Sequence, residues 1–263
     1  MNQTDSFRIP VIDIDAHPPL CPMSVDYIDR IDADIFFARL NRAGIDIACG
    51  SLTPPPDFLK THTPEEAVTL LNRGAMALSA ADSRYLPALR IHPDCPDFSI
   101  SQLDEYAPLG VRLIDIDGCH LPHPSMKAIL TRAQSLNMTV SLYGENIAQA
   151  KEMAEQFPNL RILMGGLGSL RYMPNRAFSL MQTYPNLFLN LSGTVWTFNY
   201  SLHEWAQRFG INRLFFGSGY PSCNPAGKLA AVRWELRDQP VSVFERILCK
   251  NALGLLDAEG RLQ

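Results

Sequence analysis

Short apolar runs alternate with amphipathic stretches along most of the 263-residue chain. The runs hold Val, Ile, Leu and Phe at consecutive positions, as expected for parallel strands that are buried on both faces. Eight runs are predicted to be strands, at residues 10–15, 46–52, 89–92, 111–117, 139–143, 161–164, 187–191 and 213–217.

The stretches between these runs carry the signals of helix ends. Thr63 precedes Pro64 at a first helical position, and Glu65 and Glu66 place negative charge in the first turn. Gly44 is a suitable C-terminal stop for the helix before it. Helices are predicted at residues 33–42, 63–81, 125–136, 147–156, 176–183, 202–209, 226–235 and 243–256.

Eight strands separated by helices favour a (β/α)₈ TIM barrel over an open doubly wound sheet. An open sheet of the dinucleotide-binding type has a glycine-rich turn after its first strand, whereas residues 15–19 read DAHPP here. No low-complexity linker or internal repeat divides the chain. We therefore expect a single barrel domain over residues 1–263.

Charge and composition argue against several classes of protein. The net charge of -4, with no run of Lys or Arg, argues against nucleic-acid binding and against a membrane-surface patch. Residues 1–9 lack the features of a signal peptide, and no apolar stretch is long enough to cross a bilayer. The six cysteines are scattered without CxxC pairs and are expected to be free thiols. These features predict a soluble cytoplasmic protein.

Short motifs mark the predicted strand ends in a fixed order. They are VIDIDAHP (11–18), RAGID (42–46), GVR (110–112), FPNL (157–160), YPNL (184–187), FGSGYP (216–221) and NAL (251–253). In this order and spacing they resemble the amidohydrolase-related family of metal-dependent hydrolases, which includes ACMSD-like decarboxylases. The resemblance covers about residues 10–256 and implies a TIM barrel with its site at the carboxyl ends of the strands.

The resemblance also implies metal ligands on strands one, five, six and eight. This chain keeps His17, and has Asp15, Tyr143, Gly166 and Gly219 at the other ligand positions. A divalent transition metal needs three or four converging ligands, and the aspartate missing from strand eight would also be the base in that family. We therefore expect a degenerate site, with no bound metal and no hydrolysis by the family's usual route.

A rebuilt site remains open beside this expectation. Asp15 and His17 are two residues apart, so on an extended strand both side chains point to one face. Zn, Mn or Mg held by Asp15, His17 and Asp115 is the alternative to a metal-free site. As catalytic candidates, Asp15 and His17 are expected to serve as acid and base, and Tyr143 to orient the substrate. The competing interpretation is structural: Asp15 and His17 hydrogen-bond to nearby backbone, and Tyr143 fills the space that a metal would occupy.

Other candidates for substrate contact also lie at or after predicted strand ends. They are His92, Asp115, Asp117, Glu145, Trp196 and Tyr220. Packing explains several of them equally well, and ion pairing with Arg90 or Arg112 would occupy the aspartates. Cys119, His120 and His123 suggest zinc, but two prolines and the lack of a second cysteine favour an ordinary loop.

Two functions stay open at this point. The resemblance implies a hydrolase or decarboxylase of small organic acids with noncanonical activity. The alternative is a catalytically inactive barrel that binds a metabolite or a protein partner. The expected partner is a small molecule at the barrel mouth, with no nucleic acid and no membrane, and association into a homo-oligomer through outer helices stays open.

Overall fold

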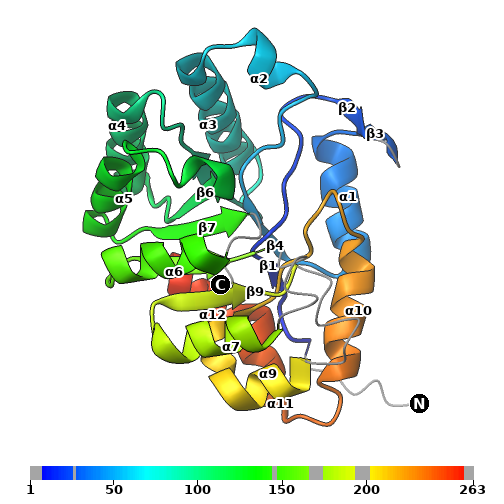
Figure 1. Cartoon of the computed structure of the whole chain (residues 1–263). Coiled ribbons are helices and arrows are strands. Elements are labelled where there is room, and N and C mark those ends of the chain that lie inside the picture. Colours follow the sequence, from blue (N-terminus) through cyan, green and yellow to red (C-terminus); the bar gives the residue numbers. More distant parts are fainter. Residues whose placement is uncertain (1–7, 26–27, 144–146, 166–173, 193–201, 258–263) are drawn as a thin grey trace.

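The computed structural model describes residues 8–25, 28–143, 147–165, 174–192 and 202–257 (Figure 1). The strands of the main sheet are β1 (Ile12–Asp13), β4 (Ile47–Gly50), β5 (Tyr85–Arg90), β6 (Leu113–Asp117), β7 (Thr139–Tyr143), β8 (Arg161–Met164), β9 (Leu187–Asn190) and β10 (Leu214–Phe215). They follow one another in the order β1-β4-β5-β6-β7-β8-β9-β10, and every neighbouring pair is parallel. The predicted TIM-barrel architecture is confirmed.

Helices connect successive strands and lie around the outside of the sheet (Figure 1). They are α1 (Ala33–Ala43), α2 (Phe58–Thr61), α3 (Pro64–Ala81), α4 (Pro96–Tyr106), α5 (Met126–Ser135), α6 (Ile147–Gln156), α7 (Pro174–Thr183), α9 (Leu202–Phe209), α10 (Pro225–Glu235), α11 (Val241–Glu245) and α12 (Asn251–Leu256). None of the helices in the described ranges is long and apolar enough to cross a membrane.

Backbone hydrogen bonds join the two ends of the sheet. The N–H of Ile14 donates to the carbonyl of Phe216 at 3.0 Å, and the N–H of His17 donates to that of Tyr220 at 3.0 Å. Ala16 and Tyr220 also form a parallel bridge. The first strand therefore meets the segment that follows β10, and the carboxyl ends of all eight strands face one mouth.

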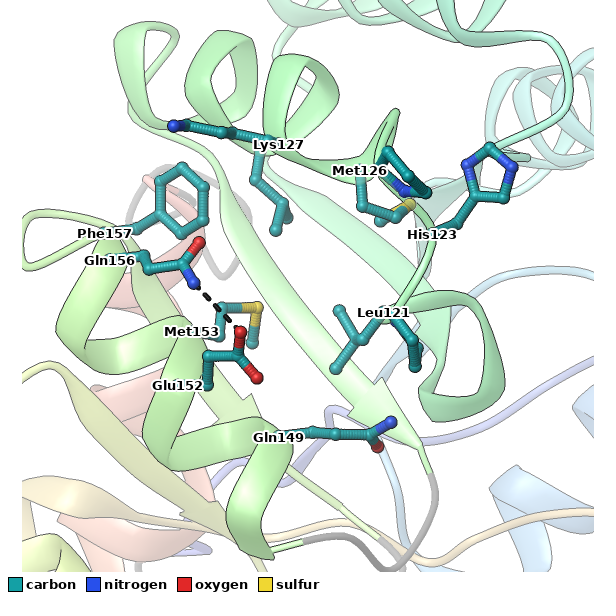
Figure 2. A pocket seen from close by; sticks show the side chains of 12 residues that line it. Leu121, His123, Met126, Lys127, Gln149, Glu152, Met153, Gln156 and Phe157 are labelled. Carbon is teal, nitrogen blue, oxygen red and sulfur yellow. Dashed lines mark hydrogen bonds between the residues drawn. The ribbon is translucent and has the colours of Figure 1, made fainter.

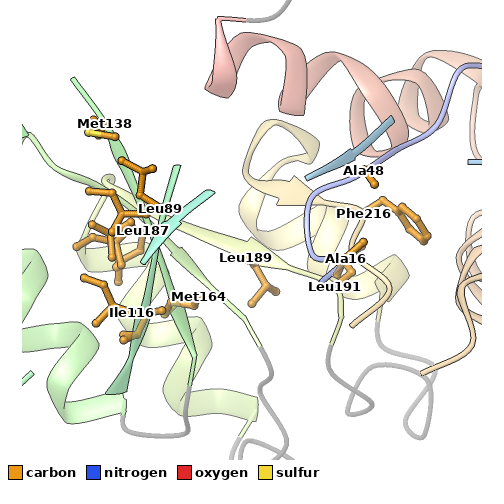
Figure 3. Close-up of a cluster of buried hydrophobic side chains, with 14 of the residues drawn as sticks. Ala16, Ala48, Leu89, Ile116, Met138, Met164, Leu187, Leu189, Leu191 and Phe216 are labelled. Atoms are coloured by element: carbon orange, nitrogen blue, oxygen red, sulfur yellow. The ribbon is translucent and has the colours of Figure 1, made fainter. Parts of the chain in front are cut away.

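Two apolar clusters lie on opposite faces of the strands. The larger one joins outward-facing strand residues such as Leu89, Ile116 and Met164 to the covering helices (Figure 3). The smaller one, on the other face, contains Leu113 and Leu163 together with residues of α12. The barrel interior is thus apolar in its lower layer, and its polar residues lie above this layer, toward the mouth.

Local signals fix several helix ends as predicted. The Thr63 hydroxyl accepts from the Glu66 N–H while the Glu66 carboxylate accepts from the Thr63 N–H, a capping box at the start of α3. Gly44 ends α1 with φ 79°, a left-handed conformation that favours glycine.

The sequence prediction differs from the structure at several elements, including the following three. It began the third strand at residue 89, whereas β5 begins at Tyr85, with Pro87 inside it. It contained no helix at α4, whose buried face includes the polar residues Ser99 and Gln102 and so lacks a clear apolar stripe. It also lacked the antiparallel hairpin of β2 (Met23–Val25) and β3 (Ile28–Ile31), which is too short to give a pattern.

Candidate functional site

Three side chains that the sequence marks as catalytic candidates meet at the barrel mouth. Asp15 and His17 follow β1, and Tyr143 is the last residue of β7. His17 Nε2 lies 2.6 Å from Asp15 Oδ1 and 2.7 Å from the Tyr143 hydroxyl. The Tyr143 hydroxyl donates to the same Asp15 oxygen. The three groups form one hydrogen-bonded network, although Tyr143 is separated from His17 by 126 positions in the chain.

The partners of His17 define its protonation. Its Nδ1 lies 3.0 Å from the Ser51 carbonyl oxygen, which can only accept a hydrogen bond. Its Nε2 faces the Asp15 carboxylate, which is also an acceptor when ionised. Both ring nitrogens therefore carry a proton, and we assign His17 as an imidazolium that is paired with an ionised Asp15.

The charges of this pair stabilise each other. Burial raises the pKa of Asp15, but the hydrogen bond and the positive charge of His17 outweigh burial, so that the pKa lies below its ordinary value. Burial lowers the pKa of His17, but the hydrogen bond and charge of Asp15, with the charge of Asp115, raise it above its ordinary value. The Asp15 side chain is 2% exposed and that of His17 is 12% exposed, so the imidazolium is the more accessible member.

Asp115 lies on the opposite side of the imidazolium ring. Its Oδ2 is 3.7 Å from His17 Nδ1 and accepts a hydrogen bond from the Ser51 N–H at 2.7 Å. Its buried Oδ1 has no hydrogen-bond partner among the residues that the structure describes, and the same holds for the buried Nδ2 of Asn190. The interior therefore has polar atoms that remain available to a water or a ligand.

Asp13 is a further buried carboxylate beneath the network, which the sequence analysis did not mark. Its Oδ1 accepts from the N–H of Ser218 at 2.8 Å and from that of Asp15 at 3.1 Å. Burial raises the pKa of Asp13 to about 6, against the opposing hydrogen bonds from Ser218. Asp13 is therefore protonated below about pH 6 and ionised above it.

The predicted metal set does not fit a metal in this arrangement. Asp15 and Asp115 approach different nitrogens of His17, and both nitrogens carry protons, so neither offers a lone pair to an ion. Gly219, at the strand-eight ligand position, has no donor side chain and adopts φ 73°. Across the described ranges, no group of three or more His, Cys, Asp or Glu side chains is placed to hold a metal ion.

Two of the remaining substrate-contact candidates lie at neighbouring strand ends. His92 follows β5, and Asp117, the last residue of β6, is the register partner of Tyr143. Asp117 Oδ1 accepts from the Cys119 N–H at 3.1 Å. Tyr220 is 2% exposed and its ring lies 5.3 Å from that of Phe36 in the core. Three predicted positions lie outside the described residues, namely Glu145, Gly166 and Trp196.

The alternative ion pairs of the aspartates are also absent from the described chain. Arg112 binds Asp257 at 2.9 Å rather than Asp115 or Asp117. The guanidinium of Arg90 forms no ion pair with either aspartate within 4.0 Å. The alternative in which one of these arginines forms an ion pair with a site aspartate is therefore not seen among the described residues.

Histidines after β5 and β6 form a second polar cluster. The His92 and His120 rings lie 4.9 Å apart, and His123 Nε2 lies 3.6 Å from Asp94. The Nδ1 atoms of His92 and His123 accept backbone N–H groups at 3.2 Å and 3.3 Å, an arrangement that leaves the proton on Nε2. With Nδ1 accepting a hydrogen bond and Nε2 protonated, neither His92 nor His123 offers a free lone pair to a metal, which is compatible with the ordinary loop that the sequence favours.

A pocket of about 380 Å³ lies away from the mouth, between α5 and α6 (Figure 2). Figure 2 shows an apolar floor that includes Leu121 and Met153, beneath a polar rim where Gln156 donates to Glu152 at 3.1 Å. None of its lining residues belongs to the Asp15–His17–Tyr143 network. We regard it as a groove between outer helices.

Comparison with known proteins identifies the family. A family model described as amidohydrolase matches residues 12–258, so the chain belongs to the amidohydrolase family. No curated protein matches the sequence significantly.

Solved structures with the same fold are distant in sequence. 2,6-Dihydroxybenzoate decarboxylase from Rhizobium is 16% identical with a TM-score of 0.73, covering 96% of this chain and 100% of its own. 5-Carboxyvanillate decarboxylase from Sphingomonas paucimobilis is 14% identical with a TM-score of 0.73, covering 95% and 99%. A dihydroxybenzoic acid decarboxylase from Polaromonas, with bound manganese and 2-nitroresorcinol, is 15% identical with a TM-score of 0.70, covering 95% and 97%.

Proposed function

We propose that this chain is a carboxy-lyase for small organic acids that works by proton transfer from His17 rather than through a metal. The observation that carries the proposal is the imidazolium of His17, held charged between Asp15 and the Ser51 carbonyl at 2.6 Å and 3.0 Å. A charged acid at a partly open position is the group that protonation of a carbon atom requires. The decarboxylases among the structural relatives supply the reaction class.

Each residue of the network has one role in this reaction. His17 Nε2 gives up its hydrogen bond to Asp15 and donates its proton to the substrate carbon that bears the carboxylate, and the bond between that carbon and the carboxylate then breaks. The electron pair of this bond stays on the substrate and carbon dioxide leaves, while His17 regains a proton from solvent. Asp15 stabilises the imidazolium between turnovers, and the Tyr143 hydroxyl, by donating to Asp15, keeps that carboxylate oriented.

A proton donor of this kind gives a defined pH dependence. The acid form of His17 must be present, so the rate should fall as the pH rises through the pKa of His17, which Asp15 raises above its ordinary value. A site that depends on a metal-bound hydroxide would show the opposite slope.

A panel of hydroxybenzoates and aliphatic dicarboxylates, assayed for carbon dioxide release, tests the proposal. We expect turnover by the wild type, and a loss of about 10²- to 10⁴-fold in His17→Asn. Lys151→Gln on the exposed surface of α6 is the matched control and should keep full activity. No turnover of any acid, or equal turnover by His17→Asn, would contradict the proposal.

An inactive barrel that binds a metabolite is the second candidate. Tyr143 and Gly219 support it, because both stand where the family's ligands are expected and neither gives an ordinary metal ligand. Binding of an acid without release of carbon dioxide, unchanged in His17→Asn, would favour this candidate.

A further inference from the structure

Arg90 is the last residue of β5 and faces the barrel interior. It pairs in register with Asp115 of β6, which pairs with Ser141 of β7. Residues opposite each other in parallel strands point to the same face, so Arg90 shares the face that carries Asp115 and, two residues beyond Ser141, Tyr143. Its charge is thus placed on the wall of the candidate site.

The guanidinium of Arg90 has no partner within the described chain. Its Nε is inaccessible to solvent and unbonded, and no hydrogen bond or ion pair of its terminal nitrogens is found among the described residues. Other arginines differ, since Arg84 binds Asp82 at 2.5 Å and Arg132 binds Asp104 at 2.6 Å. Burial raises the pKa of Asp117, but hydrogen bonds from Cys119 and the charges of His120 and Arg90 lower it, so Asp117 is a nearby charge that Arg90 does not bond. A bound anion would give this partly buried cation the bonded partner that it lacks among the described residues.

The neighbouring carboxylate does not neutralise it. Asp115 directs Oδ2 to the Ser51 N–H and lies 3.7 Å from His17 Nδ1, although its Cα is the register partner of Arg90. Among the described residues, no Arg90 nitrogen lies within 4.0 Å of a carboxylate oxygen. The longer arginine side chain therefore keeps its donors free beside the imidazolium.

The backbone beneath Arg90 is held from two helices. The Arg90 N–H donates to Asn72 Oδ1 at 2.8 Å, and Asn72 Nδ2 donates to the Arg90 carbonyl at 3.1 Å. Two residues on, the Ser99 hydroxyl bonds both the N–H and the carbonyl of His92 at 3.0 Å. Asn72 and Ser99 are completely buried, so two polar core residues fix this strand end.

We propose that Arg90 binds a carboxylate of the substrate that is retained in the product, so that the substrate is a small dicarboxylic acid. The proposal rests on the carboxy-lyase function proposed above. An ion pair to the departing carboxylate would stabilise the ground state and slow its loss, because that charge disappears in the reaction. The unbonded guanidinium of Arg90, on the same face of the barrel interior as Asp115, instead suits a second carboxylate, which it can bind through two parallel hydrogen bonds.

Binding of product-like probes tests the role of Arg90 without turnover. Calorimetry with 4-hydroxybenzoate and phenol measures how strongly the site prefers a carboxylate. We expect the wild type to bind 4-hydroxybenzoate about 10- to 100-fold more tightly than phenol. Arg90→Gln should remove this difference and leave phenol binding unchanged, while Arg90→Lys should keep part of it. Arg112→Gln, whose arginine is paired with Asp257, is the control that keeps it.

The outcomes separate the two proposals. An undiminished preference for 4-hydroxybenzoate in Arg90→Gln, or no preference in the wild type, overturns the role of Arg90 whatever the enzyme's activity. Turnover of 4-hydroxybenzoate itself at a rate equal to that of 4-hydroxyisophthalate overturns the dicarboxylate requirement but leaves the carboxy-lyase function standing. His17→Asn should lose turnover while it still prefers 4-hydroxybenzoate over phenol.

Discussion

Replacing Asp13 with Asn should change the pH dependence of stability in a defined direction. The native state holds the Asp13 proton up to about pH 6, whereas in the unfolded chain the carboxyl has its ordinary pKa of 3.8. Between these values the native state binds more protons than the unfolded state, so stability falls as pH rises. The loss is complete above the native pKa and absent below the unfolded one.

The size of this change in unfolding free energy follows from the two pKa values of Asp13. Each pH unit between them corresponds to 1.36 kcal/mol, so the interval from 3.8 to about 6 corresponds to about 3 kcal/mol for this fully buried group. Asparagine keeps the acceptor for the Ser218 and Asp15 N–H groups but does not titrate. The unfolding free energy of Asp13→Asn, relative to the wild type, should therefore rise by about 2.5 kcal/mol between pH 4 and pH 7.5, because a small part of the change lies below pH 4.

Urea unfolding of both proteins across this range measures the effect. Asp82→Asn is the control, because the hydrogen bond from Arg84 lowers the pKa of Asp82 below 3.8. The stability from that pairing is present above pH 3.8 and is lost only as the pH falls further, so the difference between this control and the wild type should stay nearly constant from pH 4 to pH 7.5. A difference between Asp13→Asn and the wild type that is the same at every pH would refute the reasoning.

Three further substitutions test other parts of the account. Asn72→Ala should cost about 2–4 kcal/mol in urea unfolding, because two backbone groups at the end of β5 lose their buried partner. Gly217→Ala should cost about 1–3 kcal/mol, since its Cβ would lie 2.0 Å from Asn190 Oδ1, whereas Gly227→Ala meets nothing closer than 4.0 Å and should not destabilise. Tyr143→Phe should lower kcat about 10- to 100-fold with little change in KM, and equal kcat would remove the tyrosine from the mechanism.

The fold was largely predictable because a parallel barrel repeats one local pattern. Each of β6, β7 and β8 carries apolar residues that a helix covers, and the predicted bounds of 139–143 and 161–164 match the structure. The α4 helix was missed because buried Ser99 and Gln102 interrupt its apolar period. Ser99 bonds the backbone of His92 and Gln102 bonds Asn72, so both are needed for contacts with other elements. Such tertiary contacts cannot be read from the local sequence pattern.

The site was predictable only in part for a similar reason. Asp15 and His17 are neighbours in the chain, so spacing alone places them on one face. The participation of Tyr143 was suggested by its strand-end position, but its contact with Asp15 depends on closure of the barrel. Arg90 and Asp13 were missed as site residues. Arg90 stands out only because its guanidinium has no bonded partner among the described residues, and Asp13 only because it is buried away from solvent.

The dependence of turnover on added metal tests whether the reaction uses the His17 proton or a bound metal. Purified protein would be treated with a chelator, its metal content measured, and carbon dioxide release followed before and after addition of Mn²⁺ or Zn²⁺. We expect the same rate of carbon dioxide release from the metal-free and the metal-loaded protein, and no release from His17→Asn. Activity that appears only on loading, in proportion to the metal bound, would contradict a site that works through the imidazolium of His17.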